Sequence, residues 1–214
     1  MPKPRFRKLD EQSRGDHSHL CPEDDCYFLY EYTSQQNYSF SATNSLISNL
    51  KKKPSQAHVR GYGYKARAIR QCASELSSAI NPRWLKGATL VPVPPSKAHS
   101  HPDYDDRVVA ICRSIRAGQA MGDVRELVIQ RISMPAAHEG ARPTVSDLLD
   151  VYEIDEVFAN PAPTRIGVVD DVLTVGAHFV AMKTILQRRF RGVPVVGFFI
   201  ARRVFANPFD ELLA

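Results

Sequence analysis

Two adjacent carboxylates stand at the point where an apolar segment of the chain gives way to a turn. They are Asp170 and Asp171, within the sequence IGVVDDVLTVGAH (Ile166–His178). Paired carboxylates at the end of a strand can accept hydrogen bonds from vicinal sugar hydroxyls and support a hydrated magnesium ion. Behind them, Thr174 and Gly176 open a turn whose hydroxyl and backbone N–H groups suit a phosphate at the start of a helix. The pattern favours a phosphorylated-sugar site over the simpler alternative, a solvent-exposed strand–helix turn.

The same segment resembles the thirteen-residue signature of type I phosphoribosyltransferases, an acidic pair followed by a Thr-Thr-Gly-x-Thr phosphate loop. The resemblance implies that Asp170 and Asp171 bind the ribose of phosphoribosyl pyrophosphate (PRPP). It implies a 5′-phosphate loop made of Thr174, Val175, Gly176, Ala177 and His178. Two positions depart from the family pattern, because Val175 replaces the second Thr or Ser and His178 replaces the closing Thr. His178 can donate to phosphate from the first helical turn, or it is an ordinary helix-start residue.

A second stretch, Val91–Arg107, resembles the ComF-like (competence-associated) branch of that family, in which a Val-Pro-Val-Pro strand runs into a basic loop and a helix. The loop after Pro95 is expected to receive pyrophosphate, with hydrogen bonds from Ser96 and backbone N–H groups and charge from Lys97. Its other candidate cations are histidines instead of the arginines usual in that branch, so its positive charge is weaker. Arg107 is a secondary ligand candidate, and the acids before it are natural helix-start residues. Residues in an order similar to that branch's middle region are Arg131, His138, Arg142, Leu148 and Leu149.

The resemblance implies an enzyme, a glycosyltransferase of the pentosyltransferase type. It would bind PRPP with magnesium and transfer the phosphoribosyl group to a nitrogenous acceptor, with release of pyrophosphate. We expect Asp170, Asp171 and Lys97 to carry catalysis by positioning and by stabilising the departing charge. Magnesium would arrive with PRPP, and the acidic pair is its only candidate contact on the protein. The acceptor is not readable from the sequence, although candidates to contact it are Tyr62, Tyr64 and Arg67.

An alternative from another functional class uses the same fold without turnover. The chain would then be a PRPP- or nucleotide-sensing module, or one associated with nucleic acid. The weakly basic loop after Pro95 favours this alternative, whereas the intact acidic pair opposes it. Nucleic-acid binding would need a basic face built from Lys51–Lys53, Arg60, Lys65, Arg67 and Arg70.

Apolar strands that alternate with amphipathic helices predict an α/β fold with a mainly parallel sheet flanked by helices. We expect strands near 27–32, 88–95, 126–131, 165–172 and 193–201, and helices near 42–52, 65–80, 104–116, 145–151 and 176–191. The resemblance implies a type I phosphoribosyltransferase (Rossmann-like) fold with an N-terminal hood-like subdomain. The expected organisation is a flexible arm over 1–20, an N-terminal or hood region over 21–87 and a phosphoribosyltransferase core over 88–214.

Composition is that of an ordinary globular protein, with 43% hydrophobic residues, 24% charged residues and a formal net charge of +5. The longest apolar run, Val193–Ala201, is too short to span a bilayer, and no apolar core follows the basic N-terminus. We therefore expect a cytoplasmic protein without a membrane partner. A nucleic-acid partner is not favoured, because the positive charge is scattered and Lys51–Lys53 suits a solvated helix end. A homodimer or a partner protein stays open.

Four residues near the N-terminus are of types that bind zinc: His17, His19, Cys21 and Cys26. Their spacing matches no standard zinc motif, so zinc is not expected there. Cys72 and Cys112 fall on apolar helical faces and are expected in the core. Without a secretion signal, all four cysteines are expected to be reduced thiols.

Overall fold

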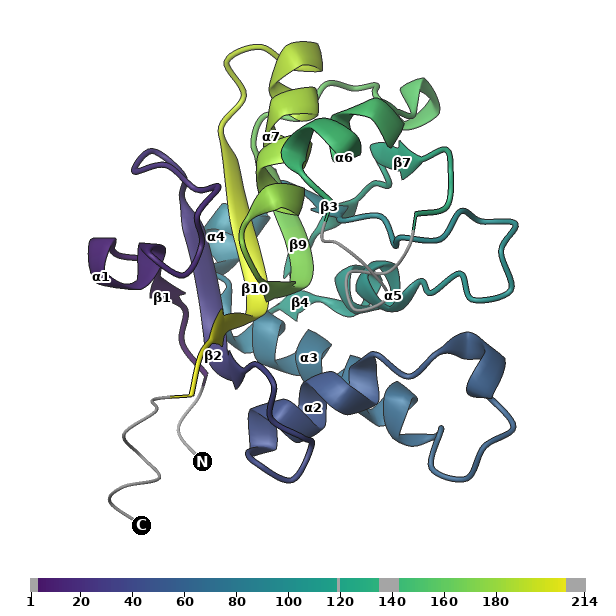
Figure 1. Cartoon of the computed structure of the whole chain (residues 1–214). Coiled ribbons are helices and arrows are strands. Elements are labelled where there is room, and N and C mark those ends of the chain that lie inside the picture. The colour runs from purple at the N-terminus through teal and green to yellow at the C-terminus, as the bar shows by residue number, and fades with distance from the viewer. Residues whose placement is uncertain (1–3, 119, 135–142, 207–214) are drawn as a thin grey trace.

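A six-stranded sheet forms the centre of the computed structural model, which describes residues 4–118, 120–134 and 143–206 (Figure 1). The strand order is β1-β2-β10-β9-β3-β6. β1 pairs antiparallel with β2, and the other neighbours pair parallel. The strands span Arg7–Lys8 (β1), Cys26–Thr33 (β2), Thr89–Pro92 (β3), Asp123–Val124 (β6), Ile166–Leu173 (β9) and Val195–Val204 (β10). The fold is therefore α/β with a mostly parallel sheet, as expected, and it is compatible with a Rossmann-like fold.

Helices cover both faces of this sheet (Figure 1). One face carries α2, α3 and α5, and the other carries α6 and α7. The helices span Glu11–Arg14 (α1), Ala42–Leu50 (α2), Tyr64–Ala79 (α3), Pro82–Leu85 (α4), Arg107–Ser114 (α5), Val145–Val151 (α6) and Ala177–Arg189 (α7). The local sequence explains α2 well, because the Ser41 side chain accepts the backbone N–H of Asn44 and so caps the helix start.

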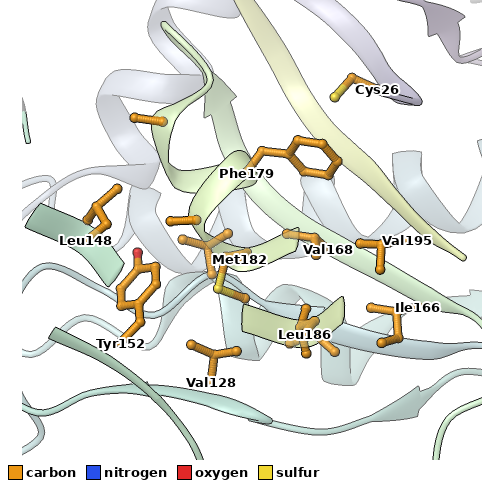
Figure 2. Close-up of a cluster of buried hydrophobic side chains, with 14 of the residues drawn as sticks. Cys26, Val128, Leu148, Tyr152, Ile166, Val168, Phe179, Met182, Leu186 and Val195 are labelled. Atoms are coloured by element: carbon orange, nitrogen blue, oxygen red, sulfur yellow. The ribbon is translucent and has the colours of Figure 1, made fainter. Parts of the chain in front are cut away.

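The central strand β9 is apolar on both faces because both are covered. Ile166 and Val168 lie in a cluster with Phe179 and Met182 of α7 (Figure 2). Val169, which points to the opposite face of the pleated strand, belongs to the cluster on the side of α2, α3 and α5. This double anchoring fixes the strand that carries the acidic pair, and β9 continues beyond that pair to Leu173.

Residues 4–20 are not the flexible arm that we expected. Arg7–Lys8 pairs with β2, and α1 begins at a capping box in which Asp10 accepts the backbone N–H of Ser13. Leu9 and Leu20 are buried, with exposed fractions of 3% and 8%. Single apolar residues between polar ones produce no periodic pattern, so the packing of this segment could not be predicted from its residues.

The region 21–87 shares its core with the rest of the chain. Its strand β2 lies inside the main sheet, between β1 and β10. Leu29 and Leu76 from this region pack in one cluster with Val108 and Ile200. Within the described residues, the expected boundary near residue 87 therefore does not separate two hydrophobic cores.

One expected strand belongs to a different sheet. The segment near 126–131 forms β7 (Val128–Gln130), which pairs antiparallel with β8 (Tyr152–Ile154) outside the main sheet. The edge strand beside β3 is instead the two-residue β6. A second small ribbon joins β4 (Arg116–Ala117) and β5 (Ala120–Met121). Short 3₁₀ turns cover Pro54–Gln56 and Glu156–Phe158.

The other expected elements are confirmed with shifts of a few residues at their ends. The α5 helix, for example, begins at Arg107 instead of near residue 104, and β3 ends at Pro92 instead of near residue 95. Within the described part of the chain, no helix combines the length and the apolar character that crossing a membrane requires.

Candidate functional site

A cavity of about 200 Å³ lies where the carboxyl ends of β3 and β9 meet. In a parallel α/β sheet this edge is where ligands bind. Its walls come from the end of α2, the segment after β3, the start of α5 and the β9–α7 turn. The lining residues that carry polar side chains are Lys51, Lys53, Ser96, Lys97, Asp103, Asp105, Arg107, Asp170, Asp171, Thr174 and His178.

The turn between β9 and α7 is held in a conformation that needs glycine. Gly176 has a φ of 91°, in the left-handed region, and a Cβ added there would lie 2.7 Å from the Leu20 side chain. The turn leads directly into α7, whose first N–H groups have no acceptor within the helix. Such a helix start favours an anion, because the exposed N–H groups and the helix dipole both point at it.

The N-terminal segment forms hydrogen bonds with the backbone of this turn. The buried His17 donates its Nδ1–H to the carbonyl oxygen of Thr174. Two residues later, the backbone N–H of His19 donates to the carbonyl oxygen of Val175 at 3.0 Å. These contacts hold the turn in place through two of its carbonyl groups.

Asp171 is buried and ion-paired with two cations. Arg107 brings Nε to 2.8 Å and Nη2 to 2.7 Å from Oδ2 of Asp171. Lys51 places its Nζ 3.3 Å from Oδ1 of the same carboxylate. The structure therefore brings Lys51 to the site, although it also lies at the exposed end of α2, as expected, with a side chain that is 43% exposed.

The ion pairs continue beyond Asp171 into the helical layer. Arg107 Nη1 lies 2.7 Å from Oδ2 of Asp105, and Nζ of the buried Lys65 lies 2.7 Å from the same oxygen. Lys65 also donates to the carbonyl oxygens of Leu50 and Lys52, at 2.9 and 2.7 Å. We call these five alternating charges, Lys51, Asp171, Arg107, Asp105 and Lys65, the charge chain. It ties the end of α2 to the acidic pair.

The two acids differ in charge state because their surroundings differ. Burial and the neighbouring Asp171 carboxylate raise the pKa of Asp170 to about 7. Burial also opposes ionisation of Asp171, but Lys51 and Arg107 outweigh it and hold its pKa well below the usual range. Asp171 is thus a fixed anion, whereas Asp170 titrates near neutral pH. One Asp170 oxygen accepts the backbone N–H of Asp171 at 2.7 Å.

His178, in the first turn of α7, pairs with a tyrosine. Its Nδ1 lies 2.7 Å from the hydroxyl of Tyr152, which is 5% exposed. Burial lowers the pKa of His178 to about 4, so the ring is neutral near pH 7.

The segment after β3 is fixed by its own backbone. The carbonyl oxygen of Ser96 accepts the Gln130 side chain at 2.7 Å and the backbone N–H of Met134 at 2.8 Å. Lys97 Nζ lies 3.2 Å from the carbonyl oxygen of Met134. These contacts hold Ser96 and Lys97 at the cavity wall.

Most of the predicted site residues come together in one place. Ser96, Lys97, Asp170, Asp171, Thr174 and His178 all line the cavity, and Val175, Gly176 and Ala177 complete the adjoining turn. Arg107, a secondary candidate from sequence, proves to be the main partner of Asp171. Sequence reasoning missed Lys51, Asp105 and Lys65, because their contacts span three separate elements.

Other candidates lie away from the cavity or outside the described residues. Tyr62, Tyr64 and Arg67 do not line it, and Tyr64 instead stacks against the Lys52 and Arg67 cations. Arg131 pairs with Glu153 at 3.1 Å. His138 and Arg142 lie outside the residues that the structure describes. Leu148 is buried in the core, with Leu149 packed against its edge.

Two of the basic residues considered for nucleic-acid binding form ion pairs within the protein. Lys65 is buried against Asp105, and Lys51 pairs with Asp171. Lys65 therefore cannot serve as a solvent-facing phosphate contact in this conformation, whereas Lys51 keeps a side chain that is 43% exposed. Arg60, Arg67 and Arg70 are exposed.

Metal coordination fits the acidic pair only in a limited way. Over residues 4–118, 120–134 and 143–206, no three His, Cys, Asp or Glu side chains gather as a protein-only metal site would require. Asp171 already faces two cations, so a bare Mg²⁺ ion would compete with both. A magnesium ion that keeps its waters and is brought in by a phosphate ligand suits this arrangement, because Mg²⁺ is commonly held by one or two carboxylates together with substrate phosphates.

The N-terminal zinc candidates have other partners. His17 bonds the β9–α7 turn, and Cys21 Sγ lies 3.2 Å from an Asp24 oxygen. Cys26, Cys72 and Cys112 are buried, and burial raises the pKa of each thiol. These three thiols are therefore core residues in the neutral form.

Comparison with known proteins adds no family. No protein-family model matches this chain, and no curated protein is significantly similar to it.

Proposed function

We propose that the protein binds PRPP together with magnesium at this cavity and transfers its phosphoribosyl group to a nitrogenous acceptor, as a type I phosphoribosyltransferase of the ComF-like branch. One observation carries the proposal: the two segments that resemble the family, 91–107 and 166–178, line the same cavity at the carboxyl edge of the sheet. The resemblance was drawn from the sequence alone, and it implied that the two segments bind parts of one ligand.

In this proposal, different residues bind different parts of the ligand. The β9–α7 turn receives the 5′-phosphate through its N–H groups and the Thr174 hydroxyl. Asp170 accepts hydrogen bonds from the ribose hydroxyls, because both oxygens of Asp171 are already engaged by cations. The pyrophosphate faces Ser96 and Lys97 across the cavity. When bound, magnesium neutralises part of the pyrophosphate charge, and the acidic pair is the group that would hold its hydration shell.

Little covalent chemistry is required of the protein in such a transfer. The bond between the anomeric carbon and pyrophosphate weakens as a sugar cation develops, in a transition state related to that of glycoside hydrolysis. In this proposal Asp170 and Asp171 supply the negative charge that stabilises that cation, and Lys97 supplies the positive charge that stabilises the departing anion. Catalysis then rests on positioning and on this charge arrangement.

Thermal unfolding tests the binding step. PRPP with magnesium should raise the melting temperature of the wild type, because a ligand that binds only the folded state stabilises it. Asp170→Asn should abolish that shift. Asp25→Asn is the matched control, since Asp25 precedes β2 at the other end of the sheet and pairs with Lys8. An unchanged melting temperature of the wild type at saturating PRPP and magnesium would refute the proposal.

A second candidate function, sensing of PRPP or a nucleotide without turnover, is favoured by a specific observation. Asp171 is neutralised by Arg107 and Lys51, so the acidic pair carries less negative charge than two free carboxylates would. A screen for pyrophosphate release across nitrogenous acceptors separates the two functions. Binding without release for every acceptor would favour the sensor.

A further inference from the structure

Lys51 is the most loosely held cation of the charge chain. Its side chain is 43% exposed, whereas those of Arg107 and Lys65 are 21% and 7% exposed. Its Nζ lies 3.3 Å from Asp171, while two nitrogens of Arg107 lie closer, at 2.8 and 2.7 Å. A half-exposed ammonium gains little from such an ion pair, because water screens the interaction. Lys51 is therefore the cation that can leave Asp171 at the lowest cost.

The backbone around Lys51 is fixed, so only its side chain needs to move. The backbone N–H of Lys51 donates to the carbonyl oxygen of Ile47 at 3.0 Å, where α2 ends. The carbonyl oxygens on either side of it, those of Leu50 and Lys52, accept hydrogen bonds from the buried ammonium of Lys65. From this fixed point, the Lys51 ammonium can change its direction on a flexible four-carbon stem. Lys51 can thus exchange one partner for another while α2 stays in place.

The charge chain contains one more cation than it contains anions. Its three cations, Lys51, Arg107 and Lys65, face the two carboxylates of Asp171 and Asp105. Arg107 bridges both carboxylates and Lys65 is buried, so the surplus positive charge is at Lys51, the half-exposed end that lines the cavity. A ligand that brings several negative charges into the cavity attracts this ammonium more strongly than Asp171 does, because Arg107 already compensates that carboxylate.

We propose that Lys51 is a specificity-determining residue, whose ammonium pairs with Asp171 in the empty site and moves to the diphosphate of the ligand on binding. The inference rests on the proposed function and deepens it, because it names the residue that selects a sugar with a diphosphate over a sugar monophosphate. The diphosphate is the group concerned, since Lys51 lines the same cavity as Ser96 and Lys97, which we assign to it. The 5′-phosphate has its own donors in the β9–α7 turn.

The move of Lys51 also frees an oxygen atom for the sugar. In the empty site, Arg107 holds Oδ2 of Asp171 and Lys51 faces Oδ1. Once Lys51 pairs with the diphosphate, Oδ1 is open to a ribose hydroxyl beside Asp170. A sugar monophosphate in the β9–α7 turn does not draw Lys51 away, so Oδ1 stays blocked. Binding of the diphosphate and binding of the ribose therefore favour each other.

Calorimetric titration with two ligands tests the proposal. PRPP and ribose 5-phosphate are titrated, at the same pH and magnesium concentration, into the wild type and into Lys51→Met. The variant should bind PRPP about tenfold or more weakly, because it lacks a charge-assisted hydrogen bond to the diphosphate. It should bind ribose 5-phosphate at least as tightly as the wild type, since Oδ1 of Asp171 is no longer blocked. The preference for PRPP over ribose 5-phosphate should therefore fall about tenfold or more.

Two further variants control for charge and for side-chain type. Lys52→Met removes the same charge one residue away, where Nζ is directed to the carbonyl oxygen of Gly61, at 2.7 Å, instead of the cavity. This variant should keep the wild-type preference for PRPP. Lys51→Arg retains a cation at the end of α2 and should keep most of the preference. Melting temperatures without ligand check that each variant is folded, and the half-exposed Lys51 ion pair predicts little change.

Two outcomes would overturn the inference. One is an equal preference for PRPP in the wild type and Lys51→Met. The other is an equal loss of preference in Lys51→Met and Lys52→Met, which would show a general effect of charge. Both outcomes leave the proposed function intact, provided that PRPP with magnesium binds the wild type. If neither PRPP nor ribose 5-phosphate binds the wild type, the proposed function itself has failed and the role of Lys51 fails with it.

Discussion

Asp170 illustrates how a functional group can weaken the fold that holds it. Its folded-state pKa of about 7 exceeds the ordinary carboxyl value of 3.8, so between these values the folded protein binds more protons than the unfolded chain. Stability from this group is therefore present at low pH and is lost as the pH rises through about 7. The same carboxylate is the one that we assign to the ribose.

Asp170→Asn should accordingly stabilise the protein at alkaline pH. At about pH 8 we expect a gain of about 2–4 kcal/mol in the free energy of unfolding, because the buried charge is removed. The gain should disappear below about pH 4, where the wild-type carboxyl is already neutral. Urea denaturation at several pH values measures it, with Asp25→Asn as the control. A pH-independent difference would contradict the assigned protonation of Asp170.

Arg107, in contrast, should stabilise the fold, because its guanidinium compensates the charges of two buried carboxylates. Arg107→Met leaves Asp105 and Asp171 with less compensation and should lower the free energy of unfolding by about 3–5 kcal/mol. Arg113→Met is the matched control on the same helix. Arg113 pairs with Glu126 at 2.7 Å, but its side chain is 65% exposed, and its loss should cost at most about 1 kcal/mol. Equal losses in urea denaturation would show that the charge chain contributes no special stability.

At the scale of elements, the start of α7 is determined by backbone geometry. Gly176 before the helix and Gly192 after it both have positive φ, at 91° and 77°. Only Gly176 has a close neighbour, because nothing lies within 4 Å of a Cβ placed at Gly192. The two positions therefore separate the cost of the left-handed conformation from the cost of a clash.

Gly192→Ala should destabilise the protein by about 1–2 kcal/mol, the cost of placing a side chain in the left-handed region. Gly176→Ala should cost about 2–4 kcal/mol, because the new methyl group also meets Leu20. The same variant should lose the melting-temperature shift with PRPP. Shortening the neighbour in the double variant Leu20→Ala/Gly176→Ala should recover part of the clash, measured by a double-mutant cycle. No coupling between the two positions would contradict the packing.

The elements that could be predicted from sequence are those with strong local patterns. The run IGVVDD followed by Thr-x-Gly identified β9 and α7 to within two residues, but the strand does not end at the acidic pair as expected, because it continues to Leu173. Partners distant in sequence were not predictable. Lys51 resembled a surface lysine because nothing near it in the chain indicates Asp171. The pairing of β7 with β8 was also missed, because strand propensity says nothing about which strand is the neighbour.

At the scale of the whole molecule, the N-terminal segment contacts the distant β9–α7 turn of the site. His17, His19 and Leu20 contact three successive residues of the β9–α7 turn, more than 150 positions later. The N-terminal segment also adds β1 to the sheet edge. A segment that reads as polar and irregular thus supports the phosphate-binding turn.

A chain that begins at residue 21 should therefore be less stable and should bind phosphate poorly. It loses the buried Leu9 and Leu20, each worth about 1.5–3 kcal/mol when fully buried, so we expect a loss of about 3–6 kcal/mol in the free energy of unfolding. A chain that begins at residue 6 keeps β1, α1 and the contacts to the turn, and it is the control. If residues 6–20 were a loose arm, the two truncated chains would have the same melting temperature and the same affinity for ribose 5-phosphate. The structure instead predicts that only the chain that begins at residue 21 loses stability and affinity. The point variant His17→Ala should show part of the same loss of affinity, because the hydrogen bond from His17 to the carbonyl oxygen of Thr174 would be absent.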